Sequence, residues 1–174
     1  PLQQARAVLQ QQAFTRIRED ANVYLMNMPT GSGKTLIYAV DDDHADLIVS
    51  ILKDIYSEYG IDNDAVMKIT GSVGGGNRKK IQEAIKRFKN ERYPSVVVTV
   101  DLLTTGIDVP EITALVFMRR IKSRILFEQM LGRATRLCPA IHKTHFEIYD
   151  PVGVYDSLEP VNRSEEHTSE LQSL

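Results

Sequence analysis

Ser95-Val-Val-Val-Thr-Val100 is the stretch of sequence that decides the fold. Its apolar and β-branched residues follow one another without alternating with polar ones, which is typical of a strand covered on both faces. Pro94 stands before the run and Asp101 after it, so its ends are clear. Strands of this kind belong to parallel sheets with helices packed on both sides. The run therefore predicts an α/β fold, and the rest of the chain should alternate strands with helices.

That alternation is present on both sides of the run. The predicted strands are 22–27, 35–40, 65–70, 95–100, 113–118 and 145–149. The predicted helices are 2–19, 43–59, 77–89 and 123–131. The helix at 43–59 has the clearest pattern, because its apolar residues recur at the spacing of one buried face. Asp42 or Asp43 can cap its start, and Gly60 can end it. Right-handed crossovers then bring the carboxyl ends of the strands to one rim, where ligands bind in open α/β sheets.

Composition narrows the class of protein. The chain has 174 residues, which is enough for one domain or for one domain and a fragment of another, and its 43% hydrophobic and 25% charged residues suit a soluble globular core. Its one cysteine, Cys138, excludes an internal disulfide and a multi-cysteine metal cluster. No apolar run approaches the roughly 20 residues that cross a bilayer, and the first residues do not read as a signal peptide. We therefore expect a cytoplasmic location.

The last twelve residues, 163–174, differ from the rest. RSEEHTSELQSL has no apolar period and resembles the in-frame translation of a short-read sequencing adapter; an ordinary polar terminus is the alternative. Without it the chain has 20 basic and 20 acidic residues, so only local clusters of charge can indicate a nucleic-acid partner. Basic runs occur at 78–92 and 119–124. They could contact DNA phosphates or be ordinary solvated faces.

The first candidate site is Met28-Pro-Thr-Gly-Ser-Gly-Lys-Thr35. It fits the nucleotide-binding pattern G-x-x-x-x-G-K-[ST] except at its first position. In that pattern, glycine N–H groups surround phosphates, the lysine reaches the β- and γ-phosphates and the Ser/Thr hydroxyl holds Mg²⁺. A helix must follow such a loop at once, whereas the next residues here, 35–40, favour a strand. The motif and its context therefore indicate different structures.

Two further segments carry polar groups in suggestive patterns. Thr104, Thr105, Gly106 and Asp108 follow the strand at 95–100 and are expected at the rim. Farther along, Gln129-Met-Leu-Gly-Arg-Ala-Thr-Arg136 places two arginines three residues apart, on one helix face. A planar guanidinium suits the charge that spreads over a transferring phosphoryl group. Either segment alone would be weak evidence.

Taken in order, the three segments resemble helicase motifs I, V and VI of superfamily two. The stretch from Asp43 to about Asp156, including IQEAIKRFKNERYPSVVVTVDLLTTGIDVPEI and KSRILFEQMLGRATRLCP, resembles the second RecA-like lobe of the R (restriction) subunit of type I restriction enzymes. The resemblance implies a RecA-like parallel sheet flanked by helices. It further implies an ATP-dependent DNA translocase with ATP and Mg²⁺ as cofactors. Implied partners are double-stranded DNA and the modification and specificity subunits of such a complex.

The resemblance also implies roles for residues of this sequence. The catalytic set would be Gln129, Arg133 and Arg136, with one arginine acting as a finger on the γ-phosphate. The nucleotide-binding set would be Gly31, Ser32, Gly33, Lys34, Thr35, Gly106 and Asp108, with Thr35 also holding Mg²⁺ through the nucleotide. Thr99, Thr104 and Thr105 would be DNA contacts. The family pattern has Thr where Val100 stands, and Thr99 lies one place earlier.

The resemblance divides the chain at an unexpected place. In such motors most of the first lobe, including the acidic D-E-x-H motif, separates motif I from the second lobe. Here Asp41-Asp-Asp-His44 resembles that motif but is better explained as a helix cap. We therefore expect residues 1–35 to be a remnant of the first lobe, 36–160 a helicase C-terminal RecA-like domain and 163–174 an artefactual tail. A deletion or misassembly would have joined the first two. Two functions follow: a motor lobe with little turnover alone, or a non-catalytic lobe that binds DNA or a partner.

Overall fold

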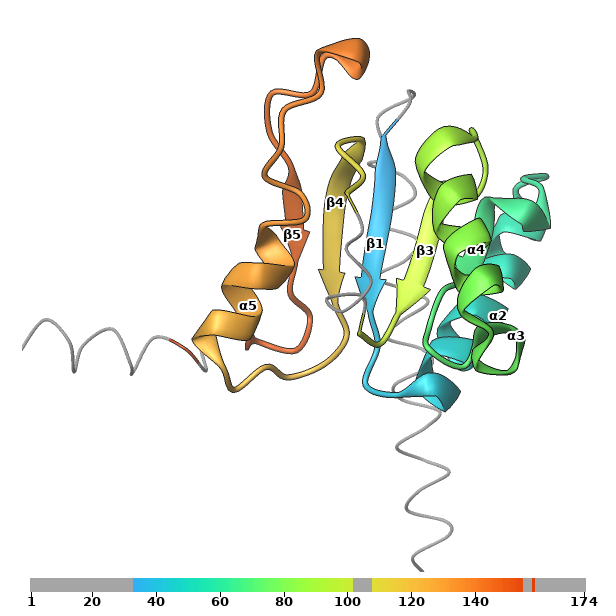
Figure 1. Ribbon diagram of the computed structural model, residues 1–174, viewed down its shortest axis with the longest axis horizontal. Helices are drawn as coiled ribbons and strands as arrows, with labels where there is room; N and C mark the ends of the chain where they lie inside the picture. Colours follow the sequence, from blue (N-terminus) through green and yellow to red (C-terminus); the bar gives the residue numbers. More distant parts are fainter. Residues whose placement is uncertain (1–32, 102–107, 155–157, 159–174) are drawn as a thin grey trace, which may run out of the picture.

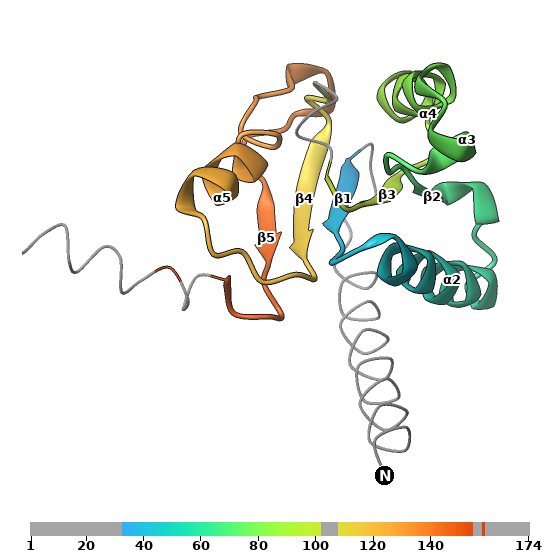
Figure 2. The same ribbon diagram turned by 60° about the horizontal axis from the view of Figure 1, so that its bottom comes forward.

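Five parallel strands form the centre of the molecule. The computed structural model describes residues 33–101, 108–154 and 158. The strands are β1 (Lys34–Tyr38), β2 (Val66–Lys68), β3 (Val96–Thr99), β4 (Ile112–Phe117) and β5 (Glu147–Tyr149). They lie side by side in the order β2-β3-β1-β4-β5, and every neighbouring pair is parallel (Figure 1 and Figure 2). The predicted parallel α/β sheet is thus confirmed. The predicted helix at 2–19, the strand at 22–27 and the tail at 163–174 lie outside the described residues.

β1 is the central strand and its sequence explains why. All five of its positions are buried, and it pairs with β3 on one side and β4 on the other. Tyr38, near its carboxyl end, stacks on Phe117 of β4 with ring centroids 5.4 Å apart. Because Lys34 and Thr35 belong to this strand, the sheet begins before residue 36, which is where the sequence placed the domain boundary.

The helices lie within one or two residues of their predicted bounds. They are α2 (Asp42–Glu58), α4 (Arg78–Asn90) and α5 (Arg124–Leu131), with a short turn of helix, α3 (Val73–Gly76), before α4. Two 3₁₀ turns, η1 (Asn63–Ala65) and η3 (Pro139–Ile141), complete the described elements. The cap of α2 differs from the prediction: Asp41 accepts from the backbone N–H of His44 at 2.8 Å, so Asp42 and Asp43 already lie inside the helix. Gly60 follows its end with a φ of +70°, as glycine permits.

The helices cover opposite faces of the sheet (Figure 2). On one face, α2 packs a strip containing Ile48, Ile51 and Ile55 against residues of β1 and β3 such as Val98. On the other face, α4 and α5 share a second core in which Phe88 and Phe127 are buried. This arrangement buries both faces of the central strands, which accounts for the uninterrupted apolar run at 95–100.

Candidate functional site

The second arginine of the Gln129–Arg136 segment is presented to solvent. Ser123 caps α5 by accepting from the backbone N–H of Leu126, and the helix ends at Gly132. Gln129 is exposed on the last turn. Arg133, which is half-buried, and Arg136 both lie beyond the helix, so the predicted placement of the two arginines on one helix face is wrong. The side chain of Arg136 is 63% exposed. Its guanidinium therefore remains accessible to an anion that approaches from outside.

Asp108 holds that guanidinium. Nη1 of Arg136 donates to Oδ2 of Asp108 at 2.7 Å, and the carboxylate is itself 44% exposed. The structure thus brings together two predicted site residues that are 28 positions apart. Asp108 is not at the rim where the sequence placed it. It stands four residues before β4, toward the amino end of that strand, because the chain has already crossed back over the sheet.

A buried lysine connects the segment that carries Asp108 to the segment that carries Arg136. Nζ of Lys143 donates to the carbonyl oxygen of Pro110 at 2.9 Å and to that of Ala134 at 2.8 Å. The side chain is 6% exposed, and burial lowers the pKa of its ammonium. Each acceptor lies two residues from a member of the Asp108–Arg136 pair, so Lys143 sets the distance between their backbones. The sequence reasoning missed it, since a single lysine before a short strand has no distinguishing spacing.

Lys34 and Thr35 lie in a β-strand and not in a phosphate-binding loop. The residues after Gly33 form β1, whereas phosphate binding requires a helix there. The side chain of Lys34 is 3% exposed, and its Nζ donates to the carbonyl oxygens of Glu91 at 2.6 Å and Pro94 at 3.4 Å. Burial lowers the pKa of this ammonium, while Glu111 opposes that shift. Thr35 is 1% exposed within the strand. Neither residue is placed to hold a phosphate or Mg²⁺.

Gly33 has a packing reason of its own. A Cβ atom at this position would lie 2.2 Å from Oγ1 of Thr113, just inside β4. Real Cβ atoms do not approach so closely, so the glycine is required by the neighbouring strand. Strand packing thus accounts for one of the glycines that suggested a nucleotide-binding loop. Gly31 and Ser32 lie outside the described residues.

Of the three predicted DNA contacts, the structure describes only Thr99. Thr99 is fully buried at the end of β3, in register with Tyr38, so its hydroxyl faces the core and not a bound polymer. Its Oγ1 and the Tyr38 hydroxyl have no hydrogen-bond partner among the described residues. Burial raises the pKa of Tyr38. The other predicted contacts and nucleotide ligands of this loop, Thr104, Thr105 and Gly106, lie outside the described residues.

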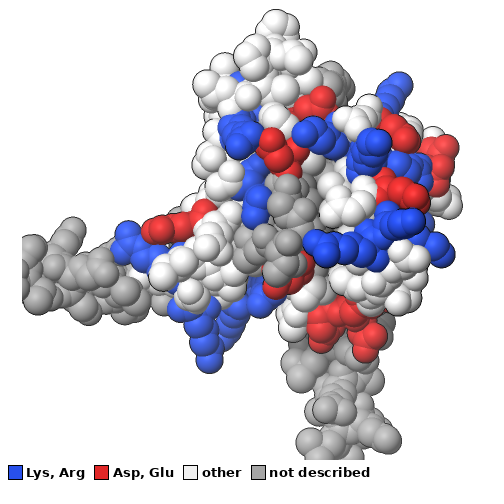
Figure 3. Space-filling model, viewed as in Figure 1, with Lys and Arg blue, Asp and Glu red and all other residues white. Residues whose placement is uncertain are grey.

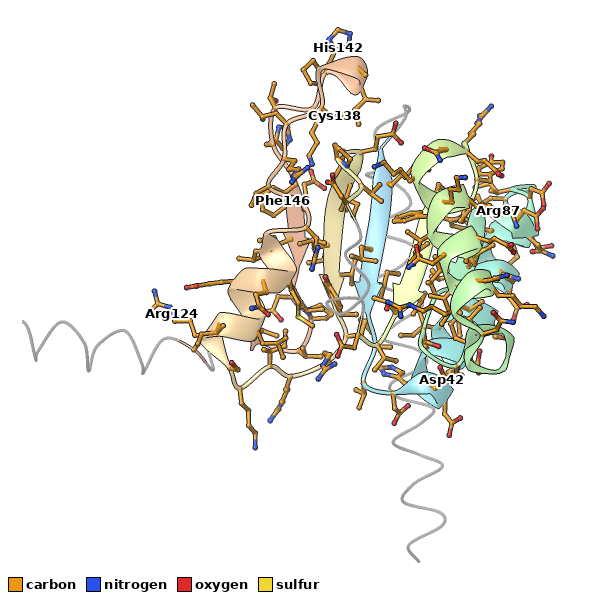
Figure 4. All side chains as sticks on the ribbon, viewed as in Figure 1. Asp42, Arg87, Arg124, Cys138, His142 and Phe146 are labelled. Atoms are coloured by element: carbon orange, nitrogen blue, oxygen red, sulfur yellow. The ribbon has the colours of Figure 1, made fainter. Side chains whose placement is uncertain are left out.

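A polar network at the carboxyl rim was not anticipated. Asp42, labelled in Figure 4, accepts from the hydroxyls of Thr70 and Ser72 and from Nζ of Lys68, at 2.5, 2.7 and 2.9 Å. Lys68 also donates to Asp46 at 2.7 Å. The hydroxyl of Thr70 is the main reason that the pKa of Asp42 falls to about 2. The hydrogen bonds close on one another, so the network joins α2 to the end of β2 and offers no reactive group.

In 33–101, 108–154 and 158, no three His, Cys, Asp or Glu side chains gather in a way that could hold a metal ion. None of the helices within those ranges is long and apolar enough to cross a membrane.

Comparison with known proteins gives consistent results. Residues 20–138 match the model of the helicase conserved C-terminal domain. The chain is 51% identical over 136 residues to the EcoKI endonuclease subunit of a type I restriction enzyme from Escherichia coli K12, covering 77% of this chain and 12% of that protein. It is 33% identical over 120 residues to the EcoAI endonuclease subunit from E. coli, covering 67% of this chain and 14% of the other. This chain therefore spans only a small part of the length of either relative.

A solved structure agrees. A fragment of a putative HsdR subunit of a type I restriction enzyme from Vibrio vulnificus YJ016 superposes with a TM-score of 0.71 at 28% identity. The match covers 88% of this chain and 30% of that one. Sequence, sheet order and superposition lead to one conclusion: this chain belongs to the helicase conserved C-terminal domain family, and resembles the type I restriction enzyme subunits within it.

Proposed function

We propose that this chain is the second lobe of an ATP-driven DNA translocase of the type I restriction kind. In this proposal Arg136 is the finger that contacts the γ-phosphate, and Gln129 and Arg133 line the same site. The observation that carries it is the exposed Arg136 guanidinium, held by Asp108 at 2.7 Å at the end of a segment matching the helicase C-terminal domain. ATP and DNA as ligands come from the family, as does a cytoplasmic location.

The Asp108–Arg136 pair suits an arginine that must change partners. An ion pair between exposed side chains contributes only about 0–1 kcal/mol, so it orients the guanidinium at little cost when a stronger anion arrives. A triphosphate offers several charged oxygens, and the planar guanidinium can contact two of them at once. Fingers of this kind contribute roughly 10³–10⁵ to the rate of phosphoryl transfer. Asp108 therefore acts as a temporary partner in the proposed cycle.

The same proposal assigns most of the nucleotide site to another lobe. Lys34 and Thr35 are buried in β1 and do not fit phosphate or Mg²⁺, so those contacts must come from outside the residues described. Mg²⁺ bound with ATP would neutralise developing charge, and this lobe would contribute only the guanidinium side. The modification and specificity subunits expected from the family would assemble through other parts of the enzyme.

A non-catalytic lobe is the second candidate function. The placement of Lys34 favours it, because the described residues contain no phosphate-binding loop of their own and Arg136 would then have no reaction to complete. In that case the domain binds DNA or another protein without hydrolysing ATP. The two functions differ in one measurable property, which is DNA-stimulated ATP hydrolysis in an enzyme that supplies the first lobe.

A chimera tests the proposal. The stretch that matches the EcoKI endonuclease subunit replaces its counterpart in that subunit, and ATP hydrolysis is followed with and without duplex DNA. We expect DNA-stimulated turnover, and a fall in kcat of roughly 10³ or more for Arg136→Ala. Arg120→Ala is the matched control, because Arg120 is exposed and makes no ion pair with a described residue. A folded chimera without turnover would support the non-catalytic lobe. Normal kcat in the Arg136→Ala chimera would show that Arg136 is not the finger.

A further inference from the structure

The outer surface of α4 carries an unusual charge for this chain. Between Arg78 and Asn90 there are six basic residues and one acidic residue, Glu83. Residues 1–162 as a whole are neutral, with 20 charges of each sign. In Figure 3 the basic side chains gather over α4, with acidic ones between them. The helix therefore concentrates positive charge, as the basic run at 78–92 indicated, although the net charge of residues 1–162 is zero.

Little of this charge is used inside the molecule. Arg87 pairs with Glu91 at 3.3 Å, four residues on. Five other cations of α4 make no ion pair or side-chain hydrogen bond with the part of the chain described here; they are Arg78, Lys79, Lys80, Lys86 and Lys89. All five are exposed. Their ammonium and guanidinium groups are therefore available to an external anion.

Three of these cations oppose the folding of their own helix. Arg78, Lys79 and Lys80 form the first turn of α4, which contains no acidic residue. The amino end of a helix carries partial positive charge, so a cation there costs about 0.3–1 kcal/mol. Asn77 caps this end by accepting from the backbone N–H of Lys79 at 3.0 Å, but a neutral amide does not offset the charge. An external polyanion would offset the positive charge of these three residues.

The spacing fits a phosphate backbone. Ile81, Ala84 and Phe88 face the core, so the cations occupy the remaining surface of the helix. Lys79, Lys86 and Lys89 lie seven and three residues apart, on the outward side, and cover about 15 Å of helix length. Neighbouring phosphates of a nucleic-acid strand can be contacted over such a length without reading the base sequence.

We propose that the outer face of α4, defined by Arg78, Lys79, Lys86 and Lys89, binds the phosphate backbone of duplex DNA without regard to sequence. These residues belong to α4, whereas Arg136 follows α5, and none of them is among the DNA contacts that the resemblance implied. The inference rests on the proposed DNA partner but does not depend on ATP hydrolysis. Electrostatic contact of this kind suits an enzyme that moves along any sequence.

Fluorescence anisotropy of the full chain tests this inference. The probes are two labelled DNA duplexes of unrelated sequence and one single strand, each measured over a range of salt concentrations. We expect equal affinity for the two duplexes and weaker binding to the single strand. In the Lys79→Gln/Lys86→Gln/Lys89→Gln variant, affinity should fall roughly tenfold or more and the salt slope by about 3. Circular dichroism checks that the variant retains its fold.

A control variant distinguishes the effect of losing the α4 surface from the effect of losing net positive charge. Lys53→Gln/Arg120→Gln/Lys122→Gln removes the same charge from α2 and from the segment before α5. It should keep most of the affinity and slope. An equal loss in both variants, an unchanged α4 variant or a preference for the single strand would overturn the inference. No binding by the unaltered chain would overturn it too, and would also remove DNA contact from the proposed function of this lobe.

Discussion

α2 and α4 perform the same task in the core and differ in almost everything else. Each lays one apolar strip on the sheet, α2 on one face and α4 on the other. Yet α2 has five acidic residues and one basic, whereas α4 has six basic and one acidic. Because the buried strip is all that the sheet requires, the outer face of each helix can serve another purpose. The charges differ where folding leaves them free.

The two sets of charges also relate differently to their helices. In α2, Asp42 and Asp43 lie in the first turn, where negative charge is favourable, and Lys68 contacts Asp42 and Asp46. In α4 the first turn is entirely basic. The first-turn charges of α2 therefore assist folding, and the first-turn charges of α4 oppose it.

Replacing a buried apolar residue of α2 or α4 by alanine should have the largest effect on the free energy of unfolding. The effect should be similar for the two helices. Phe88→Ala should lower the free energy of unfolding by about 3–5 kcal/mol, because Phe88 is fully buried under α4. Ile51→Ala on α2 should lower it by about 2–5 kcal/mol. Urea denaturation measures both. A loss below 1 kcal/mol in one variant alone would mean that the corresponding helix is not held to the sheet as described.

Lys34→Ala should come next, and it tests which task this lysine performs. Its ammonium joins β1 to the carbonyl oxygen of Glu91, just past α4, so its removal leaves buried acceptors unmet. We expect a loss of about 1–3 kcal/mol in urea denaturation. Binding of a fluorescent Mg-nucleotide to the full chain should be the same before and after the change. Lys53→Ala on α2 is the matched control, with little effect on either quantity.

If Lys34→Ala instead left stability intact and abolished nucleotide binding, the phosphate-binding interpretation of Gly33, Lys34 and Thr35 would be restored. That outcome would require the residues after Gly33 to form a helix in the bound state.

Replacing a first-turn cation should stabilise α4. Lys79→Gln removes a positive charge from the amino end of the helix, so the free energy of unfolding should rise by about 0.3–1 kcal/mol at low salt. The same change is part of the variant expected to lose DNA affinity. Stability and binding should therefore move in opposite directions. Lys53→Gln, within the acidic α2, should give no gain, and a gain of equal size there would remove the contrast between the helices.

The smallest effect should appear in acid. The pKa of Asp42 is about 2 in the folded protein and 3.8 without its partners, so the folded state favours the carboxylate. The resulting stability is present above pH 3.8 and is lost as the pH falls toward 2. Asp42→Asn should flatten that part of a stability–pH curve measured by thermal denaturation. Glu83→Gln on α4 should leave it unchanged, since Glu83 makes no hydrogen bond to a described residue.

Most of the fold could be predicted from the sequence, because its signals are local and agree. The apolar run at 95–100 and the periodic strip at 43–59 required only the rules of burial. The order of the strands could not be obtained this way, since β1 lies between β3 and β4 through pairings distant in sequence. Sequence reasoning selected Arg136 and Asp108 as candidate residues but placed Asp108 at the opposite rim of the sheet, and only coordinates show the two in contact.

The nucleotide-binding motif shows why a short pattern can mislead. Gly33 is a glycine because Thr113 leaves no room for a Cβ, and Lys34 is a lysine that reaches two carbonyl oxygens. Strand packing accounts for the glycine and hydrogen bonding for the lysine, and a phosphate-binding loop would use the same two residue types. Five letters of sequence cannot separate these demands, whereas the strand-like residues after Thr35 already favoured the first.

Lys143 gives the candidate site a mechanical property. One ammonium grips the backbone at Pro110 and at Ala134, so neither carbonyl can shift by much more than the tolerance of a hydrogen bond without taking the other along. The two backbone segments that carry Asp108 and Arg136 therefore move together as one rigid unit. A displacement of the backbone at Pro110 would be transmitted through Lys143 to the backbone at Ala134.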